Sequence, residues 1–231
     1  MAVIAMSEYR ILDLFCGLGG FSQAFEASDR WAVTTVDIEG RFDPDIEADV
    51  FDLRPSEFET AFDVVLASPP CTQFSLAASR YERFVDGEPQ TDAAADAVAL
   101  VYHTIGLIRG LNPAYWFVEN PQGWLRHVID DPEGRVTYCQ YGTDWMKPTD
   151  LWGEHPPGLS YLSCSYGDGC HADNTDQDHG GLGNCNASGT RDPAERAKVP
   201  ADLSAAIRDA CEAGLDGTVR EQTTLGEVVD T

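Results

Sequence analysis

Two consecutive prolines stand one residue after a short apolar run, and they constrain the middle of this chain more than any other feature. Residues 64–67 (Val-Val-Leu-Ala) are continuously apolar, as in a buried strand, and Pro69 and Pro70 follow. Proline donates no hydrogen bond to a sheet, so the chain must leave the sheet here. The stiff backbone then presents Cys71 at the carboxyl edge, where open α/β sheets bind ligands. Cys71 is a candidate nucleophile; the alternative is a small buried cysteine, as most free cysteines are.

A glycine-rich turn follows another apolar strand near the N-terminus. Residues 11–15 run into Gly17, Gly19 and Gly20, and a helix is expected over residues 21–28. Glycines let the backbone bend tightly and approach a ligand, and the next helix offers free N–H groups. A strand, glycine loop and helix of this kind occur in many nucleotide-binding folds.

Three aspartates are predicted at one edge of the same sheet. Residues 31–36 predict a strand that ends at Asp37, and Asp49 stands before the next helix-like segment. An acid at the tip of the second strand commonly holds ribose hydroxyls in such folds. With Asp13, these acids would line the ligand edge, although ordinary turn acids are the alternative in so acidic a chain.

A further short strand ends in a carboxylate. Residues 114–118 are apolar, Glu119 follows, and Pro121 stops the strand. Glu119 is expected near Cys71 if both strands belong to one parallel sheet. A carboxylate beside a thiol raises the pKa of the thiol, so Glu119 makes sense only as a group that handles the substrate.

These three segments together resemble the DNA cytosine-C5 methyltransferase family. The resemblance rests on residues 13–20 as cofactor loop, on Pro69-Pro70-Cys71 and on Glu119-Asn120-Pro121, in matching order and spacing, and it spans roughly residues 10–155 plus a weaker C-terminal piece. It implies an α/β, Rossmann-like methyltransferase fold with a mostly parallel central sheet. It also implies S-adenosylmethionine as cofactor and double-stranded DNA as partner, with the target base flipped out.

The resemblance assigns roles to particular residues. The Cys71 thiolate would add to C6 of cytosine, and Glu119 would contact ring N3 and the exocyclic amine. Phe15 would pack on the adenine of the cofactor, Asp37 would hold its ribose and Asp49 its amine. The expected cofactor-binding residues are Asp13, Phe15, Gly17, Gly19, Gly20, Asp37, Asp49 and Pro70. The expected substrate-binding residues are Gln73, Ser75, Arg80, Arg83, Asn120 and Thr149.

The chain departs from the family pattern in two places. Residues 140–150 stand where the family motif Gln-x-Arg-x-Arg is usual, and Lys147 is the nearest cation, so we include it among the catalytic residues. Lysine is a point charge, and a planar bidentate contact is lost. The Gly-Asn-Ser-Val motif that usually closes the cofactor site is absent; residues 191–200 stand in its place, followed by a helix expected over residues 201–214.

Three regions are expected along the chain. Residues 1–152 form the catalytic domain, residues 153–190 a small irregular recognition region rich in Gly, Asp and Asn, and residues 191–231 a helix and tail that return to the catalytic domain. Residues 91–109 have helical periodicity, closed by Gly110 and Pro113. The preceding loop carries Arg80 and Arg83 and resembles the mobile loop that closes over flipped DNA in the family.

The formal net charge of −24 is unusual for an enzyme that holds DNA. There are 39 acidic residues against 15 Lys and Arg, which is the composition of a protein soluble in saturating salt. We therefore expect a cytoplasmic protein of a haloarchaeal type, of viral or restriction-modification origin. An acidic DNA mimic or a protein-binding module is the rival interpretation that charge alone would allow.

Five Cys and His residues gather in or near the recognition region. Cys139, Cys164, Cys170, His171 and Cys185 could bind Zn²⁺, but the spacing lacks a C-x₂-C pair and favours free thiols.

We expect no signal peptide, no run long enough to span a membrane, and a monomer. The predicted function is DNA cytosine-C5 methylation. A tRNA cytosine methyltransferase and an inactive, cofactor-binding DNA-binding protein are the alternatives.

Overall fold

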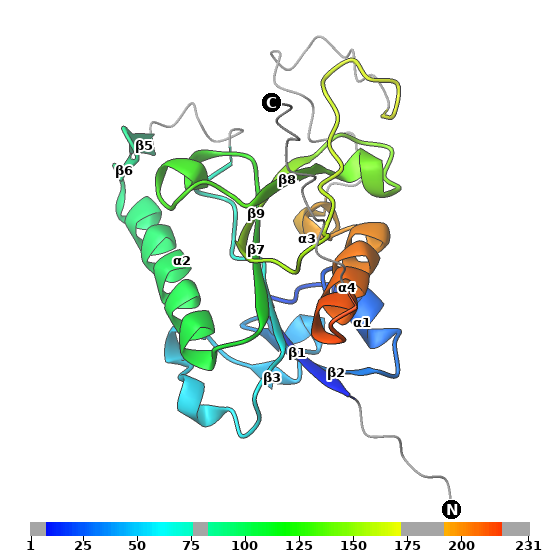
Figure 1. Cartoon of the computed structure of the whole chain (residues 1–231). Coiled ribbons are helices and arrows are strands. Elements are labelled where there is room, and N and C mark those ends of the chain that lie inside the picture. The colour runs from blue at the N-terminus through cyan, green and yellow to red at the C-terminus, as the bar shows by residue number, and fades with distance from the viewer. Residues whose placement is uncertain (1–7, 76–82, 172–191, 219–231) are drawn as a thin grey trace, which may run out of the picture.

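The computed structural model describes residues 8–75, 83–171 and 192–218, and its centre is one seven-stranded sheet (Figure 1). The strands of this sheet are β1 (Tyr9–Leu14), β2 (Trp31–Asp37), β3 (Ile46–Glu47), β4 (Val64–Ala67), β7 (Tyr115–Pro121), β8 (Gly134–Thr137) and β9 (Pro148–Glu154). A separate hairpin pairs β5 (Phe84–Val85) with β6 (Glu88–Pro89). The α-helices are α1 (Gln23–Glu26), α2 (Asp92–Leu111), α3 (Pro193–Ala197) and α4 (Ala201–Leu215). The 3₁₀ helices include η2 (Val50–Asp52), η3 (Pro55–Glu57), η5 (Trp124–His127) and η6 (Tyr138–Tyr141).

The sheet is mostly parallel, in the order β3-β2-β1-β4-β7-β9-β8. Strands β3, β2, β1, β4 and β7 pair in parallel, and β9 runs antiparallel to both of its neighbours. The predicted α/β, Rossmann-like methyltransferase fold with a mostly parallel sheet is thereby confirmed. The order reverses direction between β1 and β4, which is where sheets of this kind bind their ligands.

Helices cover both faces of the sheet, so alternate strand residues enter two separate cores (Figure 1). On one face, Leu12 and Val65 belong to the core that α2 completes. On the other, Ile11 and Val64 belong to the core that α1 and α4 complete. The four residues of β4 are fully buried, as a central strand covered on both sides must be.

Helix α2 runs past the glycine that was expected to end it. It begins at Asp92, with the Thr91 side chain accepting from a backbone N–H, and ends at Leu111, with Asn112 in the left-handed conformation (φ 53°). Gly110 lies inside the helix, at a point where a Cβ would stand only 2.7 Å from Cγ of Pro55. The prediction that Gly110 closes the helix was therefore wrong: this glycine permits close packing against η3.

By length and composition α2 could cross a membrane, contrary to the expectation that no run is long enough. In the fold, one face of α2 is buried against the sheet. The core helix of a globular domain passes the same test of length and composition, so α2 alone is weak grounds for a membrane protein.

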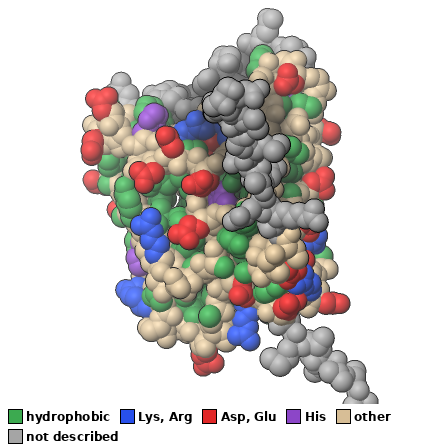
Figure 2. Space-filling view, viewed as in Figure 1, with side chains coloured by type: hydrophobic (Ala, Val, Ile, Leu, Met, Phe, Trp, Pro, Cys, Tyr) green, Lys and Arg blue, Asp and Glu red, His purple; other side chains and the backbone are tan. Residues whose placement is uncertain are grey.

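Two other segments differ from, or extend, the sequence prediction. The helix expected over residues 21–28 is only one turn, α1. The described part of the predicted recognition region, residues 153–171, begins with the last two residues of β9 and contains no helix or strand after them. Arg80 and Cys185, both predicted site residues, lie outside the described residues. Acidic side chains outnumber basic ones over the face shown in Figure 2, in keeping with the net charge of −24.

Candidate active site

The glycine loop leaves β1 through a strained turn. Phe15 has φ 61°, a conformation that is uncommon for any residue other than glycine, and Gly17 and Gly19 have φ 51° and 68°. A Cβ built on Gly17 would have no heavy atom within 4 Å among those considered, so there is open space over the loop. The loop backbone is therefore accessible at the sheet edge where a ligand would approach.

Gly20 serves a different purpose. A Cβ there would come within 2.7 Å of the backbone nitrogen of Val199, so only glycine allows the C-terminal segment to pack against the loop. The Gln23 side chain donates to the carbonyl oxygens of both residues, at 2.6 Å to Gly20 and 3.0 Å to Val199. The Ser204 hydroxyl donates to the Phe21 carbonyl at 2.6 Å. The segment that replaces the family's closing motif thus lies directly on the cofactor loop.

Asp37, at the end of β2, organises the glycine loop. Its carboxylate accepts from the backbone N–H of Gly17 and from that of Glu39, each at 2.9 Å. A carboxylate has further acceptor capacity beyond two bonds, so a ligand hydroxyl could still reach it. Asp49 lies half-buried nearby and caps η2 by accepting from the Phe51 N–H at 3.0 Å. Its expected contact with the cofactor amine stays a prediction.

Asp13 is the most unusual acid at this edge. Its side chain is fully buried, and neither oxygen accepts a hydrogen bond of good geometry from the described residues. Burial raises the pKa of Asp13 to about 7, helped by the carboxylates of Glu26 and Asp37 and opposed by neighbouring Ser22. A buried acid with unused acceptors is a position that a donor on a ligand could satisfy.

Large apolar side chains are exposed around the same loop. Leu18, Ile38 and Phe51 are three of the seven exposed large hydrophobic residues in the described part of the chain. Leu18 follows Gly17, and Ile38 follows Asp37, which the Gly17 N–H contacts. The sequence prediction missed Ile38 and Phe51, because exposure of an apolar residue cannot be seen without the fold. Exposed apolar side chains at such an edge are available to contact a flat apolar group of a ligand.

The loop after β4 presents Cys71 as the proline pair requires. Pro69 is buried, Pro70 is exposed, and the Cys71 carbonyl accepts from the N–H groups of Phe74 and Ser75 at 3.0 and 2.9 Å. As a whole residue, Cys71 is half-buried. Burial raises the pKa of Cys71, Lys147 lowers it, and Glu119 raises it again.

Glu119 lies beside this loop. Strands β4 and β7 pair in parallel, with Ala67 opposite Val118, so the residues that follow are neighbours. The Asn120 amide donates to the Pro69 carbonyl at 3.0 Å and ties the two strand ends together. Glu119 itself is buried at 4% exposure.

Tyr138 and Lys147 complete the surroundings of the carboxylate. The Tyr138 hydroxyl donates to Oε1 of Glu119 at 2.9 Å, and Lys147 Nζ donates to that hydroxyl at 3.2 Å. Lys147 Nζ lies 3.7 Å from Oε1 of Glu119, and its side chain is only 13% exposed. The ammonium group also sits over the Tyr138 ring, 4.3 Å from the centroid. Burial and Glu119 together hold the pKa of Tyr138 far above its usual range, so its hydroxyl stays protonated.

A second cation, Arg196 of α3, acts on the same thiol. Its positive charge lowers the pKa of Cys71, after burial, Lys147 and Glu119 have had their larger effects. Sequence reasoning missed both Tyr138 and Arg196, because they come from distant segments that only the fold brings to the site.

The remaining predicted substrate residues lie around the Cys71 loop. Ser75 forms an isolated bridge with Gly123, and the Arg83 guanidinium donates to the Thr72 carbonyl. Thr149 is buried opposite Pro121 in the pairing of β7 and β9, and Gln73 is half-buried in the loop itself. Four of the five predicted metal ligands, Cys139, Cys164, Cys170 and His171, also converge on one point.

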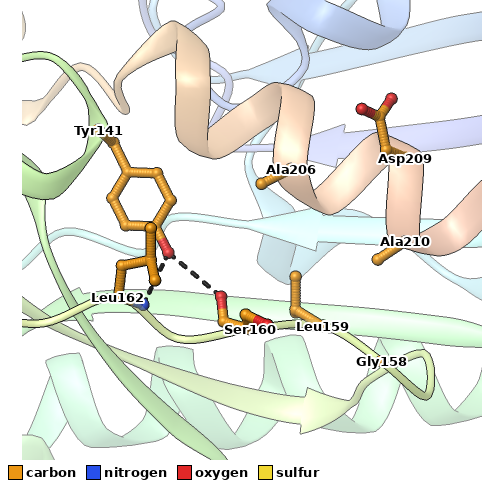
Figure 3. A pocket seen from close by; sticks show the side chains of 8 residues that line it. All are labelled: Tyr141, Gly158, Leu159, Ser160, Leu162, Ala206, Asp209 and Ala210. Carbon is orange, nitrogen blue, oxygen red and sulfur yellow. Dashed lines mark hydrogen bonds between the residues drawn. The ribbon is translucent and has the colours of Figure 1, made fainter.

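A concave pocket of about 300 Å³ lies elsewhere, between α4 and the chain around Leu159 (Figure 3). Tyr141 reaches into it, and its hydroxyl donates to Ser160 and accepts from the Leu162 N–H. None of the predicted catalytic or cofactor residues lines this pocket. The candidate active site is instead the sheet edge that joins the glycine loop to Cys71 and Glu119.

Comparison with known proteins identifies the family of the chain. The family model described as C-5 cytosine-specific DNA methylase matches residues 9–129. A relative named "Probable DNA (cytosine-5)-methyltransferase", from Frog virus 3 (isolate Goorha), is 36% identical over 156 residues, which cover 62% of this chain and 69% of that protein.

Two bacterial relatives match over similar stretches. The type II methyltransferase M.HaeII of Haemophilus aegyptius is 25% identical over 154 residues, 59% of this chain and 44% of that protein. The type II methyltransferase M.DdeI of Desulfomicrobium norvegicum is 27% identical over 128 residues, 50% of this chain and 28% of that protein. The chain thus spans less than half the length of these two relatives.

Proposed function

Because the chain belongs to the C-5 cytosine-specific DNA methylase family, we propose that it methylates cytosine C5 in DNA with Cys71 as nucleophile. The observation that carries this proposal is the joining of two strand ends. The parallel pairing of β4 and β7, and the hydrogen bond from Asn120 to the Pro69 carbonyl, hold Cys71 next to a buried Glu119. A nucleophile and a carboxylate fixed side by side suit attack on a ring that the carboxylate also holds.

The cofactor expected for this chemistry is S-adenosylmethionine, and the residues at the glycine loop fit it. Space is open over Gly17, the exposed apolar side chains of Ile38 and Phe51 can flank an adenine, and Asp37 retains acceptor capacity for ribose hydroxyls. The buried Asp13 carboxyl has no hydrogen-bond partner of good geometry among the described residues, so a polar group of the cofactor could pair with it. When bound, S-adenosylmethionine supplies the methyl group that C5 acquires.

The residues of the chain account for the other steps. Attack of the Cys71 thiolate forms a bond from sulfur to C6 and breaks the C5–C6 double bond, which makes C5 nucleophilic. Glu119 holds the pyrimidine edge through N3 and the exocyclic amine, in a position fixed by Tyr138. After methylation, loss of the C5 proton restores the double bond as the sulfur leaves. The base must be flipped out of the duplex to reach this site.

The thiol needs help to ionise. Burial raises the pKa of Cys71, and the Glu119 carboxylate raises it further. Lys147 and Arg196 supply the opposing positive charge, which favours the thiolate. Lys147 Nζ also lies 3.7 Å from Oε1 of Glu119. One ammonium group would thus stabilise both the Cys71 thiolate and the carboxylate that holds the substrate. We propose that this lysine replaces the arginine usual at this place in the family.

The acidic composition suggests how DNA is held. With a net charge of −24, the protein would repel DNA at low salt. Molar salt would screen this repulsion, but phosphate contacts would then give little affinity, because counterion release contributes little when salt is already molar. We propose that the protein works in a high-salt cytoplasm, as a monomer, and reads DNA through hydrogen bonds and shape.

The test is methyl transfer from tritium-labelled S-adenosylmethionine to random-sequence duplex DNA and to tRNA, each at low and at molar KCl. Label in DNA alone supports the proposal, and label in tRNA alone assigns the chain to the RNA branch. No label on either substrate, with cofactor bound in a dialysis assay, identifies an inactive binding protein. Cys71→Ser should abolish transfer and keep cofactor binding, because the cysteine lies outside the glycine loop.

A further inference from the structure

Four metal-ligating side chains meet at one point beyond the proposed active site. They come from two parts of the chain: Cys139 from η6, and Cys164, Cys170 and His171 from the segment after β9. Their ligand atoms all lie within 4.8 Å of one another. The other described cysteines, Cys16, Cys71 and Cys211, belong to the glycine loop, the β4 loop and α4.

The distances in this cluster suit a tetrahedral ion. Sγ of Cys170 lies 3.8 Å from Sγ of Cys139 and 3.4 Å from Nδ1 of His171, and Sγ of Cys164 lies 3.8 Å from the same nitrogen. Zinc bonds of about 2.3 Å to sulfur and about 2.0–2.1 Å to nitrogen give tetrahedral edges of about 3.8 Å and 3.6 Å. The Cys139–Cys164 sulfur distance is 3.2 Å, so that pair must widen by about half an ångström for an ion to fit.

The backbone brings these side chains together independently of any metal. The Thr137 hydroxyl accepts from the Cys164 N–H at 2.8 Å, and the Thr137 N–H donates to the Leu162 carbonyl at 3.0 Å. Asp168 then closes a turn by accepting from the Ser165 N–H at 2.7 Å. This turn brings Cys170 back toward Cys139 and Cys164. The ligand set is therefore largely preorganised.

The segment has no hydrophobic core of its own. Between residues 162 and 171, Cys164 is the only buried residue, while Leu162 and Tyr166 are 48% and 73% exposed. Ordinary core cysteines pack among apolar side chains, and exposed Cys170 does not. A metal cross-link is a common substitute for a missing core in small irregular segments.

We propose that Cys139, Cys164, Cys170 and His171 bind one structural Zn²⁺, which fastens the segment after β9 to η6. Three thiolates and one imidazole form a closed tetrahedral set with no position left for a substrate, so the ion holds structure and performs no chemistry. The site lies next to Tyr138, whose hydroxyl contacts Glu119. Zinc would thus also fix the start of η6 against the catalytic carboxylate. This inference does not depend on the methylation proposal.

The decisive variant is Cys170→Ser, because Cys170 is exposed and its loss removes no core contact. The full chain is produced with a tag that lacks histidines, in zinc-supplemented medium under reducing conditions, and metal is measured by mass spectrometry after dialysis against a weak chelator. We expect about one zinc ion per chain in the wild type and in Cys211→Ala, a control that removes a cysteine of the α4 core and leaves all four proposed ligands in place. Cys170→Ser should lose at least about tenfold in zinc affinity, with an unchanged circular dichroism spectrum.

Cobalt provides an independent readout. Titration of the metal-free wild type with Co²⁺ should give the intense visible d–d bands and the sulfur charge-transfer band of a tetrahedral thiolate site, saturating at one equivalent. Cys170→Ser should lose charge-transfer intensity. The proposal is overturned if the reduced wild type binds neither metal, or if Cys170→Ser keeps wild-type zinc affinity.

Discussion

Asp13 should destabilise the cofactor-free protein, and replacing it with asparagine should relieve that cost. Its carboxyl is fully buried, and burial raises its pKa from 3.8 to about 7. Between these two values the unfolded chain has lost the proton while the folded chain still holds it. Unfolding then releases a proton, so the free energy of unfolding falls as pH rises through this window and levels off above about pH 7.

The size of the effect follows from the two pKa values. The difference between the folded and unfolded pKa values of Asp13 lowers the free energy of unfolding by about 2 kcal/mol at pH 5 and by about 4 kcal/mol at pH 8, since each unit of pKa shift corresponds to about 1.4 kcal/mol. Asp13→Asn is nearly isosteric and has no charge to bury. We expect it to raise the free energy of unfolding by about 2 kcal/mol more at pH 8 than at pH 5.

Urea unfolding followed by tryptophan fluorescence, without cofactor, measures the free energy of unfolding at pH 5 and at pH 8. Asp29→Asn is the matched control, because Asp29 is exposed and its replacement removes the same unit of charge from a chain of net charge −24. The reasoning is refuted if Asp13→Asn gains no more stability at pH 8 than at pH 5, or if Asp29→Asn behaves identically. The same variant should bind S-adenosylmethionine more weakly, because one buried carboxyl oxygen of Asp13 would be replaced by an amide group that can only donate.

Three further predictions follow from other charges in the structure. Lys147→Met should slow alkylation of Cys71 by iodoacetamide by about tenfold at pH 8, because the lysine lowers the pKa of that thiol; an unchanged rate would show that the charge does not act on it. Asp150→Asn should lower the free energy of unfolding by about 2 kcal/mol, because the fully buried Asp150 pairs with Arg126, whereas Asp209→Asn at an exposed ion pair should change it by less than about 0.5 kcal/mol. The midpoint temperature of thermal unfolding should be higher in about 2 M KCl than in about 0.1 M KCl, because salt screens the repulsion among acidic residues. A midpoint temperature that falls as salt is added would contradict the high-salt interpretation.

The strands that lead into the site could be predicted from the sequence because their signals are local. Pro69 and Pro70 mark the end of β4, and the glycines mark the turn after β1. These signals depend on backbone hydrogen bonding and on allowed dihedral angles, which neighbouring residues decide. The sequence placed Glu119 near Cys71 only if β4 and β7 belong to one parallel sheet, and the structure shows that the two strands pair directly in parallel.

Other features depend on contacts between distant segments and could not be predicted. Gly110 looks like a helix terminator in the sequence, but it lies within α2, where the absence of a side chain leaves room for Pro55. Tyr138 has no local signal for its hydrogen bond to Glu119, which exists because β8 and β9 bring η6 to the end of β7. The convergence of Cys170 on Cys139 arises in the same way, and the spacing of the cysteines gave little sign of it.

Covalent capture of the substrate tests the central claim most directly. A random-sequence duplex containing 5-fluorocytosine, incubated with the protein and S-adenosylmethionine, should stop the reaction after methylation, because fluorine at C5 cannot leave as a proton would. We predict a protein–DNA adduct whose digested peptide carries the nucleotide on Cys71, formed only with cofactor and absent from Cys71→Ser. DNA methylation without any such adduct, or an adduct on another residue, would contradict the assignment of Cys71 as nucleophile.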